Sequence, residues 1–169
     1  MNYLVIALRI IHIVAGIFWV GGTLMMAFFI GPSIGATGEA GQKFVGHLMN
    51  NLKFSNRIAA AAGLTILAGF ILYWIDSDGF TSAWMSSGAG RGFGIGAVFA
   101  IVGLVFGTLI GRTARAIAQL GAQVQGKPSP EQMTQLETLR KRQATYTNIT
   151  AVLLILSVIF MAIARYLVF

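Results

Sequence analysis

The stretch that decides the fold is YLVIALRIIHIVAGIFWVGGTLMMAFFI, residues 3–30, which is almost entirely apolar. A helix needs about 20 apolar residues to cross the hydrocarbon core of a bilayer. The stretch is too long for the hydrophobic region of a secretory signal peptide, and no basic segment precedes it. We therefore expect a retained membrane-spanning helix that ends near Gly31 and Pro32.

Three further apolar segments are long enough to span a membrane, at about residues 55–75, 92–111 and 149–169. The composition agrees, because 56% of the 169 residues are hydrophobic and only 10% are charged, against about 25% in soluble domains. We expect one domain, residues 1–169, with an all-α fold: an integral membrane four-helix bundle. There is no cysteine, which excludes disulfides and thiolate metal sites.

The segment between the first two spans is GEAGQKFVGHLMNNLKF, residues 38–54. Its apolar residues Phe44, Val45, Leu48 and Leu52 recur at helical spacing. This pattern predicts a short amphipathic helix that lies in the membrane interface.

The third and fourth spans are expected to continue beyond the membrane as an antiparallel helical hairpin, residues 112–148. The second helix of this hairpin has a clear start. Ser129 suits the N-cap, Pro130 suits the first helical position, and Gln132 completes a capping box.

The basic residues are distributed unevenly between the two ends of the bundle. Nine of the twelve follow the first and third spans, and three lie at or inside helix ends on the other side. Cytoplasmic loops carry the excess of Lys and Arg, so the hairpin is predicted to be cytoplasmic and both termini non-cytoplasmic, in the cell inner (plasma) membrane. The basic residues flank apolar segments and do not indicate nucleic-acid binding. The nine are Lys43, Lys53, Arg57, Arg112, Arg115, Lys127, Arg140, Lys141 and Arg142.

Small residues are expected to bring the helices together, because hydrophobicity does not drive association inside lipid. The third span carries a stripe of small residues at steps of three and four, and the second span carries a similar face. The stripe is Gly96, Ala100, Gly103, Gly107 and Gly111, and the second face is Ala62, Thr65, Gly69 and Tyr73.

The first span carries the polar residues that suggest chemistry. Arg9, His12, Gly16, Trp19 and Thr23 fall on one face at steps of three and four. An ionisable group inside a span costs about 2.5–3.5 kcal/mol on insertion scales and usually faces the bundle or a cavity. His12 lies about 13 Å along the helix at 1.5 Å per residue, so it needs a polar partner.

The fourth span ends on the same side as the first begins. Counted back from the end of the chain, Arg165 lies at about the depth of Arg9, and Met161 lies about 12 Å in, level with His12. The pattern predicts a layer containing His12 and Met161 with two arginines above it.

Three interpretations of this layer remain open. It suits haem b, because His and Met are axial ligands and paired arginines bind the two propionates; Trp19 and Gly16 would then line the pocket. It equally suits Cu(I) held by His12 and Met161. In the third interpretation there is no ligand: His12 bonds a neighbouring helix, Met161 fills core space, and the arginines extend to the interface.

The sequence LRIIHIVAGIFWVGG, residues 8–22, resembles the opening of small membrane proteins of the copper-resistance D (CopD) type and of the HemJ-type protoporphyrinogen oxidases. The shared pattern is a histidine early in the first helix, then an aromatic residue and glycine, here His12, Trp19 and Gly21. FSNRIAAAAGLTILAGFILYW, residues 54–74, is similar to both in its basic start and late glycine.

The resemblance implies a four-helix bundle around His12, with haem in the HemJ-type case and copper handling in the CopD-type case. HemJ-type proteins carry a lysine near the start of the third span, where this chain has Arg91. Arginine stays protonated and cannot act as a ligand or proton acceptor.

Three functions follow as hypotheses. The first is a small haem-b-binding protein with an electron-transfer or oxidoreductase role near the non-cytoplasmic face. The second is a copper-handling membrane protein, and the third is a non-catalytic accessory or assembly subunit of a membrane complex. The expected partners are the lipid bilayer, a redox partner, and a homo-oligomer or membrane complex, with no nucleic acid.

Overall fold

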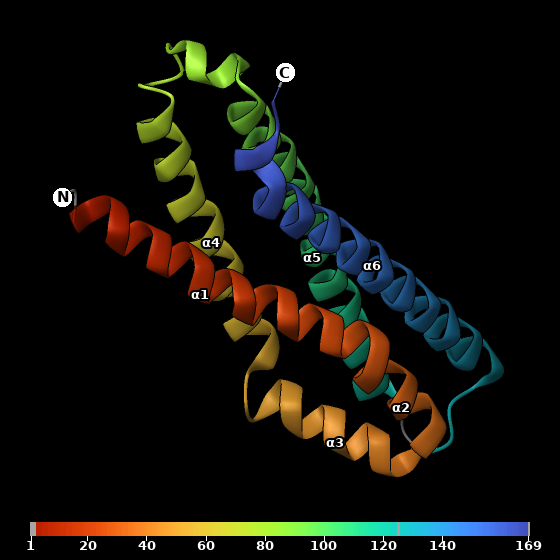
Figure 1. Cartoon of the computed structure of the whole chain (residues 1–169). Helices are drawn as coiled ribbons and strands as arrows, with labels where there is room; N and C mark the ends of the chain where they lie inside the picture. The colour runs from red at the N-terminus through yellow and green to blue at the C-terminus, as the bar shows by residue number, and fades with distance from the viewer. Residues whose placement is uncertain (1–2, 125, 169) are drawn as a thin grey trace.

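A computed structural model describes residues 3–124 and 126–168, and this part of the chain is helical without a β-strand. Four helical stretches are long and apolar enough to cross a membrane, as predicted: Tyr3–Thr37, Phe54–Asp76, Gly88–Gln123 and Pro130–Tyr166. Both ends of the described chain lie at one end of the bundle (Figure 1). An even number of spans requires this arrangement.

The first stretch does not end at Gly31 and Pro32, so that predicted boundary is wrong. Helix α1 (Tyr3–Met25) passes through a π-helical turn (Met26–Ile30) into α2 (Gly31–Thr37). The amide of Gly31 donates to the carbonyl of Met26, five residues back. Because this wider turn changes the hydrogen-bond register, the helix continues through Pro32, which has no N–H to donate.

The predicted amphipathic helix is present as α3 (Glu39–Asn50). Gly38, with φ of +56°, separates it from α2. Phe44 is 55% exposed, and Leu52 lies beyond the helix end. Helix α4 (Phe54–Asp76) begins directly after Lys53.

A loop with a short 3₁₀ helix (Ala83–Ser86) leads from α4 into α5 (Gly88–Gln123), which begins four residues before the predicted third span. Helix α6 (Pro130–Ile163) follows a turn and ends in a 3₁₀ turn (Ala164–Tyr166). The predicted capping box is confirmed: the Ser129 hydroxyl accepts from the Gln132 amide at 3.2 Å, and the Gln132 side chain accepts from the Ser129 amide at 2.9 Å.

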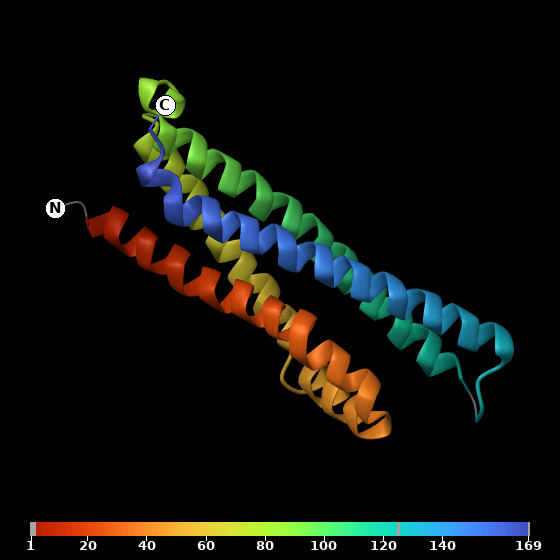
Figure 2. The same cartoon turned by 45° about the vertical axis from the view of Figure 1, so that its right-hand side comes forward.

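The bundle consists of two antiparallel pairs, α1 with α4 and α5 with α6, which lie side by side (Figure 2). A small core joins them where all four helices meet. Trp19 of α1 is only 3% exposed there and packs with Ala61 and Ala62 of α4, Ala100 of α5 and Leu154 of α6. The rest of the apolar surface is largely exposed, as a lipid environment allows.

The small-residue stripe of α5 explains the closeness of the α5–α6 pair. Gly96 and Gly103 are buried against α6, and the Ser157 hydroxyl donates to the Gly96 carbonyl at 2.8 Å. A Cβ added at Gly107 or Gly111 would meet no atom within 4 Å. Only the half of the predicted stripe that is nearer the termini packs closely.

Candidate functional site

His12 lies against α4, and its ring orientation is the central feature of the site. Its Nδ1 is 2.8 Å from the backbone carbonyl oxygen of Thr65. A carbonyl oxygen can only accept, so Nδ1 is the donor, and in the neutral imidazole Nε2 keeps its lone pair. A ring nitrogen that donates to a backbone carbonyl while the other stays free is the usual state of a metal-ligating histidine.

A glycine makes this orientation possible. A Cβ at Gly69 would lie 2.7 Å from Cε1 and 2.8 Å from Nδ1 of His12, so a larger residue would displace the ring. One turn along α1, a Cβ on Gly16 would lie 3.5 Å from the Thr65 methyl group. The predicted small-residue face of α4 therefore receives both α1 and the imidazole.

An open pocket of about 420 Å³ lies at the end of the bundle nearer the termini. The structure places both Arg9 and Arg165 on this pocket, together with Asp76. In the described chain the one ion pair joins Lys43 to Glu39, so neither arginine is paired with the Asp76 carboxylate. The full lining is Arg9, Asp76, Trp84, Ala89, Phe93 and Arg165.

The aromatic side of the pocket is held by packing between α4, the following loop and α5. The rings of Trp84 and Phe93 stack with centroids 6.4 Å apart and an angle of 21°. Tyr73 contacts Trp84 edge-on at 5.2 Å, and its hydroxyl donates to the Gly90 carbonyl at 3.1 Å. The pocket is therefore lined by packed aromatic rings and by two guanidinium groups that have no carboxylate partner in the described chain.

Met161 packs elsewhere. A Cβ at Gly96 would lie 3.2 Å from both Cγ and Cε of Met161, so the thioether lies on α5 whereas the His12 ring lies on α4. Trp19, expected in the pocket wall, lies in the core that joins the helix pairs and does not line the pocket.

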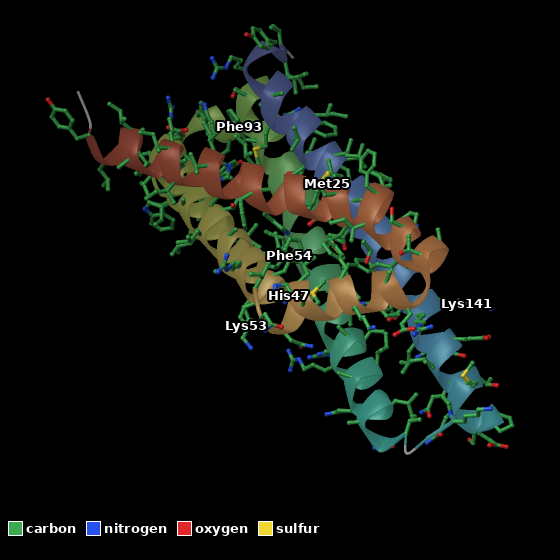
Figure 3. All side chains as sticks on the ribbon, turned by 90° about the horizontal axis from the view of Figure 1, so that it is seen from below. Met25, His47, Lys53, Phe54, Phe93 and Lys141 are labelled. Carbon is green, nitrogen blue, oxygen red and sulfur yellow. The ribbon has the colours of Figure 1, made fainter. Side chains whose placement is uncertain are left out.

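The described residues contain no group of three or more His, Asp or Glu side chains that would hold a metal ion. His47 is exposed near the end of α3, well apart from Phe93 (Figure 3). His12 is therefore the only histidine available to a cofactor in the half of the bundle nearer the termini.

Sequence reasoning missed four pocket residues, Asp76, Trp84, Ala89 and Phe93. Asp76 directly follows the predicted second span, and no periodic pattern connects it to the two arginines. The helical spacing of Thr65 and Gly69 did mark the face that receives His12, but packing alone explained that spacing.

Comparison of the chain with known protein families, with curated proteins and with solved structures finds no match. The resemblance to CopD-type and HemJ-type proteins therefore stays a prediction.

Proposed function

We propose that this membrane protein binds haem b in the half of the bundle nearer its termini and transfers electrons there. The observation that supports this most is the His12 ring, whose Nδ1 donates to the Thr65 carbonyl at 2.8 Å. That bond fixes the ring and leaves the lone pair of Nε2 for a metal.

The pocket in the same half of the bundle, which His12 itself does not line, has residues that suit the group chemically. Arg9 and Arg165 would bind the two propionates by charge-assisted hydrogen bonds, since no carboxylate among the described residues pairs with them. Trp84 and Phe93 offer an apolar ring surface, and Asp76 offsets part of the positive charge. Haem b, when bound, supplies one-electron redox chemistry.

Met161 as the second axial ligand stays a prediction, because its known contacts are with α5. The copper proposal depends on Met161 more strongly, since it needs both side chains on one ion. Haem needs only His12 and the two arginines, so it is the better supported proposal. Equal copper content in the wild type and His12→Ala would exclude copper at this site.

The haem site would lie toward the non-cytoplasmic face of a bacterial inner membrane. The supporting observation is that nine basic residues lie at the end with α3 and the α5–α6 turn, and three at the other. An electron-transfer partner would then approach from the side of the termini.

The test is an absorption spectrum of the full chain purified from haem-replete cells. We expect a Soret band in the wild type, its loss in His12→Ala, and weaker haem retention in Arg9→Gln and Arg165→Gln. His47→Ala is the matched control and should keep the full spectrum, because His47 is exposed near the end of α3. A colourless wild type that takes up no added haemin, or an unchanged spectrum in His12→Ala, would exclude the proposal.

A further inference from the structure

We infer that the end of the molecule with α3 binds phospholipids that have an anionic headgroup. The binding surface consists of a basic collar and an adjoining apolar groove, and it uses no residue of the proposed haem site. The basic collar is Lys43, Lys53, Arg57, Arg112, Arg115, Arg140, Lys141 and Arg142.

Charge is concentrated at this end. The chain there carries nine basic and three acidic side chains, a net charge of +6, whereas the end with the termini carries three basic and two acidic, a net charge of +1. All collar residues are exposed. The one ion pair of the described chain, Lys43 with Glu39 at 2.8 Å, leaves the other seven collar residues without a carboxylate partner.

The fold gathers the collar from separate segments. In the antiparallel α5–α6 pair, the rings of Phe106 and Tyr146 lie 5.9 Å apart. The same register, continued away from the membrane core, brings Arg112 and Arg115 of α5 beside residues 140–142 of α6. Figure 3 shows Lys53 near one end of α3 and Lys141 on α6, well apart from Lys53.

The two collar residues at the start of α4 lie at the depth expected for the headgroups. Helix α4 has 23 residues, which at 1.5 Å per residue is about 34 Å, close to the hydrocarbon thickness of about 30 Å. Lys53 precedes its first residue and Arg57 lies in its first turn. Clusters of four to eight Lys and Arg directly beyond a membrane helix attract anionic lipids.

An apolar groove of about 340 Å³ opens beside the collar, between the end of the first span and α3. Phe29, Ile34 and Phe44 line it, and Phe44 is the neighbour of Lys43. The side chains of Lys43 and Glu39 are both more than three-quarters exposed, so their ion pair is weak. Glu39 therefore competes only weakly with a lipid phosphate for Lys43. An apolar groove beside a cationic collar suits a ligand with an acyl chain and a negative headgroup, not a free phosphate.

The experiment is native mass spectrometry of the full chain in detergent, with equimolar phosphatidylglycerol and phosphatidylcholine of identical acyl chains. We expect phosphatidylglycerol to be retained at least about fivefold more, which is about 1 kcal/mol, the contribution of one basic residue near an anionic surface. The preference should fall as salt rises toward about 1 M, because exposed charges are then screened.

The combined variant Arg140→Gln, Lys141→Gln and Arg142→Gln should bring the two lipids close to equal retention. The control variant Arg91→Gln with Lys127→Gln removes cations outside the collar and should keep the preference. Equal retention by the wild type, an equally large loss in the control, or displacement of the lipid by the same concentration of glycerol phosphate would each overturn the inference.

Discussion

The two helix pairs each place a glycine beneath a long side chain of the partner helix, yet the two side chains differ in chemistry. In the α5–α6 pair, Gly96 receives the thioether of Met161. In the α1–α4 pair, Gly69 receives the imidazole of His12. The thioether of Met161 packs against α5, whereas the imidazole uses one nitrogen to bond α4 and keeps the other.

The hydrogen bonds between helices also differ in chemistry between the two pairs. In the α5–α6 pair the Ser157 hydroxyl donates to the Gly96 carbonyl and so joins the two backbones. In the α1–α4 pair the equivalent bond to the Thr65 carbonyl comes from an ionisable ring. Small residues at the helix contact therefore allow close packing in one pair and hold an oriented, ionisable side chain in the other.

The largest effect should come from separating the two pairs at their junction. Trp19→Ala removes the largest side chain of the core cluster to which all four helices contribute, and we expect a loss of about 3–5 kcal/mol in the free energy of unfolding, measured in detergent by SDS titration. Phe18→Ala is the control, because Phe18 is 50% exposed on the same helix and should have little effect. Similar losses in both variants would show that the pairs do not depend on this core.

The next largest effect is expected from a variant that disturbs close packing in the α5–α6 pair. Gly96→Leu should lower the free energy of unfolding by about 1–3 kcal/mol, because the added side chain meets Met161 and the Ser157 carbonyl within 3.2 Å. Gly107→Leu lies on the same helix where a Cβ meets nothing within 4 Å, and it should be tolerated. If both variants unfold alike, the contrast between the two halves of the stripe is wrong.

Gly69→Ala tests the α1–α4 pair by moving the imidazole. The added Cβ would displace the ring and break its bond to Thr65, at a cost of about 0.5–1.5 kcal/mol. The ¹⁵N signals of His12 should change from the Nδ1–H tautomer to a mixture. Gly63→Ala, on the same helix with nothing within 4 Å, should leave them unchanged. An unaltered tautomer in Gly69→Ala would contradict this role for the glycine.

The smallest effect is expected for Ser157→Ala. It removes the bond to the Gly96 carbonyl, and interhelical hydrogen bonds in membranes contribute about 0.6 kcal/mol on average. The same unfolding titration measures this change. Thr108→Ala serves as its control, because that hydroxyl bonds only a carbonyl of its own helix. If Thr108→Ala lowers the free energy of unfolding more than Ser157→Ala does, the hydrogen bond between helices contributes no more than one within a helix.

The parts of the fold that depend on local sequence were predictable. Long apolar runs gave the four spanning helices, and the spacing of Ser129 and Gln132 gave the start of α6. The prediction failed at Pro32, because a proline normally ends a helix and only the π-helical turn before it allows the chain to continue.

The depth of the candidate site residues along the helices was predictable, but the directions of their side chains were not. Counting residues along two helices put Arg9 and Arg165 at one level, and both line the same pocket. The same count put Met161 level with His12, but depth does not specify the direction of a side chain. The rotation of α6 about its own axis turns Met161 toward Gly96.

By itself the sequence determined that this chain forms membrane-spanning helices and which of its ends is strongly basic, because these properties need only composition, length and local spacing. Only the tertiary structure decided that His12 meets Thr65 and Gly69, and that Trp19 joins the two pairs. The physical reason is that the spanning helices are apolar on nearly every face. Which face meets which neighbour then depends on close packing and a few polar bonds between helices far apart in the sequence.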